Sequence, residues 1–277
     1  MATCKIEATR FPDLPPLTFQ QVEYLQRYCA AGKALACDAI SDVWIRTTER
    51  YDLLHDLWNH ATISALERTF EARLIPLNKV WPDIPSEDQF RPIVVLSPMY
   101  KWLELRFLPQ LMRYLTNTLD RNQTGFVRGM GTHVNLRLLI EKLATSRQRD
   151  GMCCVFIDYK SAYNTVCRDV LYRALVTKKI LTPGEARFLE RLHDCLYFKV
   201  GADLRFHFRN GVHQGSPISP ALFDIYMEDV MREICLSCTD KNLWYKLYAD
   251  DLVPVTPQEH LNSLLTALAD VSTRYKS

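Results

Sequence analysis

The spacing of apolar residues along the chain predicts a protein rich in amphipathic helices. Apolar side chains that recur every three or four residues line one face of a helix, and that face packs into a core. Such spacing covers residues 19–36, 52–72, 99–119, 134–143, 168–178, 185–195, 221–236 and 260–275. We expect the apolar stripe over residues 52–72 to be core packing and not a cofactor site.

Short runs of β-branched and aromatic residues between these helices predict strands. Residues 73–82 and 89–97 are bounded by prolines and predict one hairpin, and residues 197–200 and 204–208 predict another. From residue 151 onward the elements follow the order strand, helices, hairpin, helix, hairpin, helix. This order predicts an α+β fold in which an antiparallel sheet is backed by helices.

Two of the predicted strands lead into acidic residues. The apolar run over residues 152–157 ends at Asp158, and a hairpin over residues 243–255 carries Asp250 and Asp251 at its tip. An Asp-Asp pair in a turn is, by itself, typical of a solvated turn. If the two strands are neighbours in one sheet, however, Asp158 and Asp250 converge at one end of it. Facing carboxylates repel unless cations separate them, so the pattern indicates a nucleotidyl-transfer centre with two metal ions.

The bulk composition narrows the class of protein. The 277 residues are 48% hydrophobic and 24% charged, which suits one large domain or two small ones. The net charge of +2 excludes the strongly basic class of small DNA-binding modules, so nucleic-acid binding would depend on local patches. No apolar run is as long as a membrane span, and residues 1–10 lack the apolar centre of a secretory signal. We therefore expect no membrane partner.

The cysteines indicate a reducing environment. There are nine of them, an odd number, and most lie within apolar patterns. Reduced and buried thiols of this kind are typical of intracellular proteins, although the pattern does not distinguish the nucleus from an organelle. Cys235 and Cys238 form a single C-x-x-C, which without a second pair is only a weak indication of zinc.

One glycine-rich loop, residues 123–132, stands before the helix over residues 134–143. It lacks the lysine of a phosphate-binding P-loop. Glycine nevertheless lets backbone N–H groups approach closely, so the loop is a weak candidate for contact with nucleotide or nucleic-acid phosphates. Thr132 is suited to cap the helix that follows.

Five segments between residues 74 and 253 form an ordered set of motifs. They are Arg91-Pro92-Ile93; Gln123-x-Gly125-Phe126-x-x-Gly129-x-x-Thr132; Phe156-Ile157-Asp158 with Ala162-Tyr163; Gly211-x-x-Gln214-Gly215 with Ser219-Pro220-x-x-Phe223; and Tyr248-Ala249-Asp250-Asp251. Together they resemble the reverse transcriptases, most closely those of non-long-terminal-repeat retrotransposons and group II introns. A match to the last four residues alone would be weak, but five motifs in this order argue against chance.

The resemblance implies an RNA-directed DNA polymerase, a nucleotidyltransferase that adds dNTPs to the 3′-hydroxyl of a DNA or RNA primer on an RNA template. Asp158 and Asp250 would hold two Mg²⁺ ions, with Mn²⁺ as a substitute. Asp251 would be a weaker third acid, unless it is only a solvated turn residue. The backbone carbonyl of Tyr159 would complete one coordination shell.

The resemblance also implies which residues contact the nucleotide. The ring of Tyr163 would be a steric gate that clashes with a 2′-hydroxyl, or else plain core packing. Arg91 would bind the triphosphate, Gln214 would touch the incoming nucleotide, and Gly215 would leave room for the template base. His213 is expected to be a loop or template-side contact and not a general base.

A lysine contact is less well defined by the resemblance. Many relatives carry a lysine directly after the proline of the first strand, where this chain has Leu77. Lys79 either reaches the same place from a shifted register, or the chain lacks this contact.

The implied architecture is the fingers and palm of a right-hand polymerase. Residues 1–72 would be an N-terminal helical extension, residues 73–150 the fingers, and residues 151–277 a palm that stops before the primer grip and thumb. A further segment or another chain would then supply the thumb. The alternative is a non-catalytic descendant, either a maturase-like RNA-binding protein or a structural component.

Overall fold

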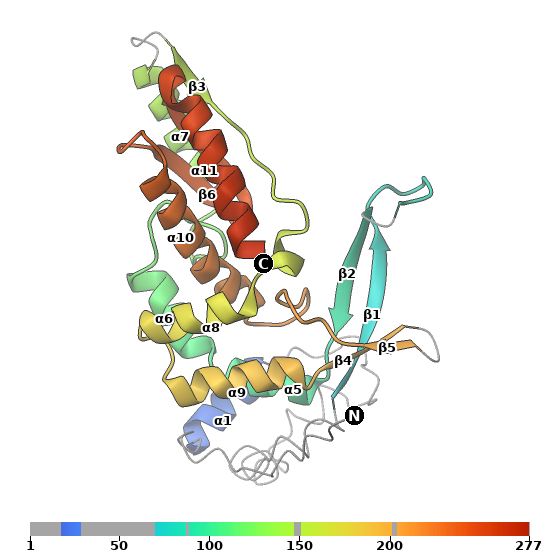
Figure 1. The fold of residues 1–277 in the computed structure, drawn as a ribbon. Helices are drawn as coiled ribbons and strands as arrows, with labels where there is room; N and C mark the ends of the chain where they lie inside the picture. The colour runs from blue at the N-terminus through green and yellow to red at the C-terminus, as the bar shows by residue number, and fades with distance from the viewer. Residues whose placement is uncertain (1–17, 29–69, 87–88, 147–150, 201–203, 277) are drawn as a thin grey trace. The chain divides into compact units, whose positions relative to one another are not determined.

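The structure is a computed structural model that describes residues 18–28, 70–86, 89–146, 151–200 and 204–276 (Figure 1). The chain forms two compact units, and each is described here by itself. The first unit comprises the described parts of Met1–Pro109, Leu181–Arg209 and His213–Ile218. The second comprises those of Gln110–Ile180, Asn210–Val212 and Ser219–Ser277. The boundaries of these units differ from the predicted boundaries at residues 72 and 150. The predicted boundaries concern functional subdomains and remain a prediction.

The first unit contains a four-stranded sheet with the order β2-β1-β4-β5. Strands β1 (Glu71–Asn78) and β2 (Phe90–Val95) form the predicted proline-bounded hairpin. Strands β4 (Tyr197–Val200) and β5 (Leu204–Phe206) form the second predicted hairpin, and β4 pairs in parallel with β1. This corrects the predicted order, in which the second hairpin belongs with the strand that leads to Asp158.

Aromatic packing and helix capping hold the first unit together. Its described helices are α1 (Phe19–Tyr28), α5 (Pro98–Leu105) and α9 (Pro183–Asp194). The buried rings of Phe70 and Tyr100 meet edge to face, and the Tyr100 hydroxyl donates to the Leu192 carbonyl of α9 at 3.2 Å. Thr182 and Glu185 form a capping box at the start of α9, as their spacing predicts.

One predicted helix is interrupted. Instead of a continuous helix over residues 99–119, α5 ends at Leu105 and α6 begins at Leu108 and runs to Asn117. The reason is Pro109, which has no N–H to donate to the Leu105 carbonyl and whose ring would collide with that carbonyl in a continuous helix. The proline is tolerated in the first turn of α6, so the helix restarts there.

The second unit contains a three-stranded antiparallel sheet with the order β3-β7-β6. Its strands are β3 (Met152–Cys154), β6 (Trp244–Tyr248) and β7 (Asp251–Pro257). Its helices are α6, α7 (Thr132–Ser146), α8 (Arg168–Thr177), α10 (Ser219–Ser237), α11 (Gln258–Lys276) and the short η3 (Ala162–Thr165). Helix α11 packs on β3 and β7, α7 contacts β6, and α10 packs on α11 and α8. The predicted α+β class, with helices against an antiparallel sheet, is confirmed.

Two helix predictions fall partly outside the described residues. The helix predicted over residues 19–36 is described only as far as Tyr28, where α1 ends. The helix predicted over residues 52–72 lies outside the described residues up to residue 69, and its predicted end is wrong because Glu71 and Ala72 begin β1.

The described residues also bear on the cysteines and on membrane contact. Six cysteines are described, and all are free thiols: Cys153, Cys154, Cys167, Cys195, Cys235 and Cys238. Within the described part of the chain, no helix combines the length and the apolar character that crossing a membrane requires.

Candidate active site

The Asp-Asp pair lies at the β6–β7 turn, as predicted. Tyr248 pairs with Asp251, so Ala249 and Asp250 form a two-residue turn and Asp251 is the first residue of β7. Ala249 has a φ of 55°, a left-handed conformation that tight hairpin turns require. Asp250 is half-buried and Asp251 is exposed, so the two acids occupy different environments.

Asp158 reaches the same end of the sheet. Strand β3 pairs with β7, and beyond β3 the backbones of Ile157 and Leu252 exchange hydrogen bonds of 2.9 and 3.1 Å. Continuing this register by one residue places Asp158 opposite Asp251. The predicted convergence of the two acidic segments is therefore confirmed.

These carboxylates fit divalent cations. Asp158 and Asp251 are exposed, and neither forms an ion pair with any residue that the structure describes. Asp158 and Asp251 therefore offer carboxylate oxygens of like charge at one end of a sheet, and oxygen ligands are what Mg²⁺ prefers.

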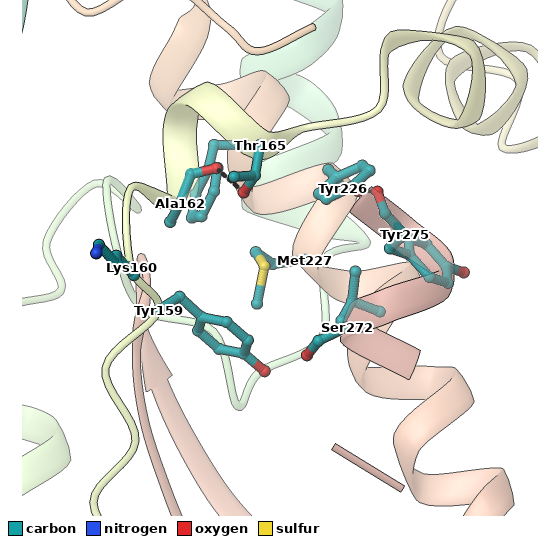
Figure 2. Close-up of a pocket in the computed structure, with 10 residues that line it drawn as sticks. Tyr159, Lys160, Ala162, Thr165, Tyr226, Met227, Ser272 and Tyr275 are labelled. Carbon is teal, nitrogen blue, oxygen red and sulfur yellow. Dashed lines mark hydrogen bonds between the residues drawn. The ribbon is translucent and has the colours of Figure 1, made fainter. Parts of the chain in front are cut away.

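The side chain of Tyr159 lies in a cavity that none of the three acids lines. It lines a small cavity of about 30 Å³ with residues of η3, α10 and α11, and its hydroxyl points toward Ser272 (Figure 2). Burial raises the pKa of this hydroxyl to about 12. The cavity has room for a few water molecules at most and cannot admit a nucleotide. What Tyr159 can offer to a metal is therefore its backbone carbonyl, as the resemblance implies.

Tyr163 lies in η3, close to the candidate carboxylates. Its ring stacks on Phe223 of α10 with centroids 4.6 Å apart and planes 12° from parallel. Burial raises the pKa of its hydroxyl, and the nearby charges of Asp224 and Asp250 raise it further. The ring is thus held flat on α10, in the electrostatic field of Asp250, as a neutral phenol.

Asp224 is a neighbour of this site that the sequence did not reveal. Its side chain is fully buried on α10, and neither carboxyl oxygen is hydrogen-bonded to a described residue. Burial raises the pKa of this carboxyl from 3.8 to about 8, so Asp224 is largely protonated at neutral pH. The only available signal was an acid at an otherwise apolar helix position.

The raised pKa of Asp224 predicts a pH dependence of stability. The folded state retains a proton that the unfolded state loses near pH 3.8, so stability falls as the pH rises from there through about 8. We expect Asp224→Asn, which is isosteric and neutral, to flatten this decline and to raise the free energy of unfolding at pH 9 by a few kcal/mol, at about 1.4 kcal/mol per unit of pKa shift. Urea unfolding from pH 5 to 9 measures it. Asp270→Asn, at an exposed site on α11, is the control, and parallel pH profiles for wild type and Asp224→Asn would contradict the prediction.

Arg91 and Lys79 lie on the β1–β2 hairpin of the first unit. Arg91 pairs with Leu77, and both side chains are exposed. The Lys79 N–H donates to the Gln89 carbonyl at 3.0 Å, so the ladder continues beyond β1. Because side chains alternate along a strand, Lys79 shares a face of the hairpin with Leu77 and Arg91. Many relatives carry a lysine where this chain has Leu77, and this geometry favours the interpretation that Lys79, two residues later, takes the place of that lysine.

Gln214 and Gly215 are bound to the backbone of β2, also within the first unit. The Gln214 carbonyl accepts from the Val94 N–H at 2.8 Å. Gly215 has a φ of 132°, and a Cβ there would lie 2.1 Å from the Val94 carbonyl oxygen. The glycine is therefore required for close backbone packing, whatever room it also leaves for a template base.

We expect Gly215→Ala to lower the free energy of unfolding by about 3 kcal/mol, since it combines a disfavoured φ with a backbone collision. Gly129→Ala is the matched control, because Gly129 also has a positive φ, of 78°, but has no atom within 4 Å of the added methyl group. That control should cost only about 1 kcal/mol. Urea unfolding measures both, and equal losses would show that the Val94 contact is unimportant.

His213 does not lie where a template could reach it. It is buried, and its ring packs against His193 at 5.4 Å and Phe198 at 5.1 Å. Its side chain and those of Glu104 and His193 offer potential ligand atoms within 4.8 Å of one another. Of the two expectations for His213, the position in a loop is confirmed, whereas a template-side contact does not fit a buried core residue of the first unit. Cys235 and Cys238 belong to no such group among the described residues.

The glycine-rich loop supports the Asp250 turn. A Cβ on Gly125 would lie 2.3 Å from the Ala249 nitrogen, so this glycine is in contact with the turn. The loop was a weak candidate for contact with phosphates, and at Gly125 the close neighbour is the protein's own backbone.

Comparison with known proteins agrees with this geometry. Residues 82–277 match the family model described as reverse transcriptase (RNA-dependent DNA polymerase). The chain is 24% identical over 257 residues to the RNA-directed DNA polymerase from mobile element jockey of Drosophila funebris, an alignment covering 87% of this chain and 27% of that protein. It is 27% identical over 206 residues to the Pol polyprotein from type-1 retrotransposable element R2 of Popillia japonica, covering 70% of this chain and 28% of that protein. The chain thus spans about a quarter of the length of these curated relatives.

Proposed function

Because the chain belongs to the reverse transcriptase family, we propose that it is the RNA-directed DNA polymerase domain of a retroelement or intron-encoded protein. It would extend a DNA or RNA primer with dNTPs on an RNA template. The observation that carries this proposal is the convergence of Asp158 with Asp250 and Asp251 through the Ile157–Leu252 pairing. A protein that only binds RNA has no need of three acids at the end of one sheet.

The three acids would hold two Mg²⁺ ions, with Mn²⁺ as a substitute. When bound, such ions lower the pKa of the primer 3′-hydroxyl and neutralise charge on the triphosphate. Asp158 and Asp250 would be the main ligands, Asp251 a weaker one, and the Tyr159 carbonyl would complete one shell. Because β3 and the β6–β7 hairpin belong to one sheet, their backbone pairing would keep the three acids near one another before any ion is bound.

The remaining residues would select and bind the nucleotide. The Tyr163 ring, held flat on Phe223, would lie under the sugar and clash with a 2′-hydroxyl. Arg91 and Lys79, on one face of the β1–β2 hairpin, would bind the triphosphate. Gln214 would touch the nucleotide, and its backbone bond to Val94 limits where it can lie.

In the right-hand description, β1–β2 and the helices after it belong to the fingers, and β3, β6 and β7 to the palm. Free cysteines in the described residues support an intracellular location.

Primer extension tests the function. The full chain is incubated with an RNA template, a DNA primer, dNTPs and Mg²⁺, beside Asp158→Asn and, as a matched control, Asp270→Asn. We expect extension by wild type and control, and none by Asp158→Asn or after chelation of Mg²⁺. Absence of extension, with salt-sensitive RNA binding that Asp158→Asn leaves unchanged, would instead indicate a non-catalytic RNA-binding descendant.

A further inference from the structure

The loop before α7 pairs with β6, the edge strand of the β6–β7 hairpin that carries Asp250 and Asp251. The Leu247 N–H donates to the Asn122 carbonyl at 2.9 Å, and the Thr124 N–H donates to the Leu247 carbonyl at 3.0 Å. These bonds form a parallel bridge between Gln123 and Leu247, so the loop extends the sheet by one short segment next to β6.

The side chain of Gln123 bonds the turn itself. It is 4% exposed, and its Oε1 accepts from the Ala249 N–H at 3.0 Å and from the Gly125 N–H at 2.8 Å. Its Nε2 donates to the Ala249 carbonyl at 3.2 Å. One side chain thus pairs both backbone polar groups of Ala249, which requires a donor and an acceptor together, as the amide of Gln123 offers.

Ala249 has the least favourable backbone conformation in the turn. Its left-handed φ of 55° is uncommon for a residue with a side chain, and it is itself buried. Gly125, whose N–H bonds the same Gln123 oxygen, also packs closely on the turn, because an added Cβ there would lie 2.3 Å from the Ala249 nitrogen. Asp250 follows Ala249 directly, so the orientation of the Ala249 peptide determines where the Asp250 carboxylate points.

We propose that Gln123 is a positioning residue, which fixes the Ala249 backbone and thereby the Asp250 and Asp251 carboxylates for catalysis. This role rests on the proposed polymerase function. Gln123 is buried and its side chain bonds backbone groups of Ala249 and Gly125, so it would act through the turn and not on the substrate. Misplacement of a catalytic group by about 1 Å can slow a reaction about a hundred-fold, so a rigid turn matters more for rate than for binding.

The test uses Gln123→Met, which keeps the side-chain length but removes all three hydrogen bonds. Asn122→Leu is the matched control, because Asn122 bonds Lys246 in the body of β6 and leaves the turn untouched. Hydrogen exchange of the Ala249 amide is measured in the full chain, together with primer–template affinity and the single-turnover extension rate.

In Gln123→Met we expect the Ala249 amide to exchange at least about ten-fold faster and extension to slow about a hundred-fold, with primer–template affinity within about two-fold of wild type. Asn122→Leu should change none of these by more than about two-fold. Unchanged exchange at Ala249, or equal slowing in both variants, would overturn the proposal.

Two further outcomes keep this proposal separate from the polymerase assignment. If Gln123→Met does not fold, the wild-type chain still provides a test, because exchange of its Ala249 amide at the rate of an unprotected peptide would overturn the proposal. If the wild type extends no primer, the polymerase function fails, and with it the catalytic role of Gln123, even where exchange shows that the Gln123 bonds exist.

Discussion

Replacing Asp250 by asparagine is expected to slow primer extension by a thousand-fold or more, whereas Asp251→Asn should slow it by roughly ten-fold. Loss of a metal ligand removes several kcal/mol of transition-state stabilisation, and each 1.4 kcal/mol is about ten-fold in rate. Asp250 is half-buried in the turn, and its charge reaches Tyr163, while Asp251 is exposed at the start of β7. A less solvated carboxylate interacts more strongly with a cation.

Single-turnover extension at saturating primer–template and dNTP measures both variants, and the Mg²⁺ concentration for half-maximal rate should rise in each. Both substitutions preserve side-chain shape, so folding should be unaffected, as circular dichroism can verify. Equal rates for Asp250→Asn and wild type would refute the two-metal assignment at this turn. Equal losses in both variants would show that Asp251 is a full ligand and not a weaker third acid.

Replacing Tyr163 by valine is expected to reduce the preference for dNTPs over ribonucleotides by about 100-fold, mainly through faster incorporation of ribonucleotides. The ring is held on Phe223 with planes 12° apart, so it cannot easily turn aside for a 2′-hydroxyl. Removing a steric barrier of this kind changes discrimination by one to a few powers of ten. Valine keeps a small apolar group in η3, next to α10, but removes the ring.

The ratio of kcat/KM for a dNTP to that for the matching ribonucleotide is the measurement. Tyr163→Phe is the matched control, since it keeps the ring and its stacking and should retain the wild-type ratio. The alternative interpretation, plain core packing, predicts a different result. In that case Tyr163→Val would slow both nucleotides equally, lower stability, and leave the ratio unchanged.

Local sequence patterns were sufficient to predict those elements that are stabilised by interactions between residues close together in the chain. The Thr182 and Glu185 capping box follows from residues three positions apart. Likewise, the β6–β7 hairpin follows from a turn flanked by apolar strands. The break at Pro109 could also have been predicted from the local sequence, because proline cannot continue the helix from α5. It was missed because the helical spacing of apolar residues continues across the proline.

The convergence of Asp158 with Asp250 was predicted only conditionally. The sequence indicated two strands that each end at an acid, but whether they are neighbours depends on pairing between segments about 90 residues apart. The structure confirms that pairing, and it places the predicted hairpin over residues 197–208 in the other sheet, beside β1. Strand order is set by how whole elements pack, and period-two alternation contains no information about it.

By itself, then, the sequence determined the family, the helices and hairpins, and the acids of the candidate active site, because motif spacing and side-chain periodicity are properties of neighbouring residues. The tertiary structure alone decided what surrounds them. It buried His213 among aromatic rings, isolated the Asp224 carboxyl beside Tyr163, and set Gln123 against Ala249 across more than a hundred residues. Burial and long-range hydrogen bonding depend on which distant segments share a core, and no local pattern specifies them.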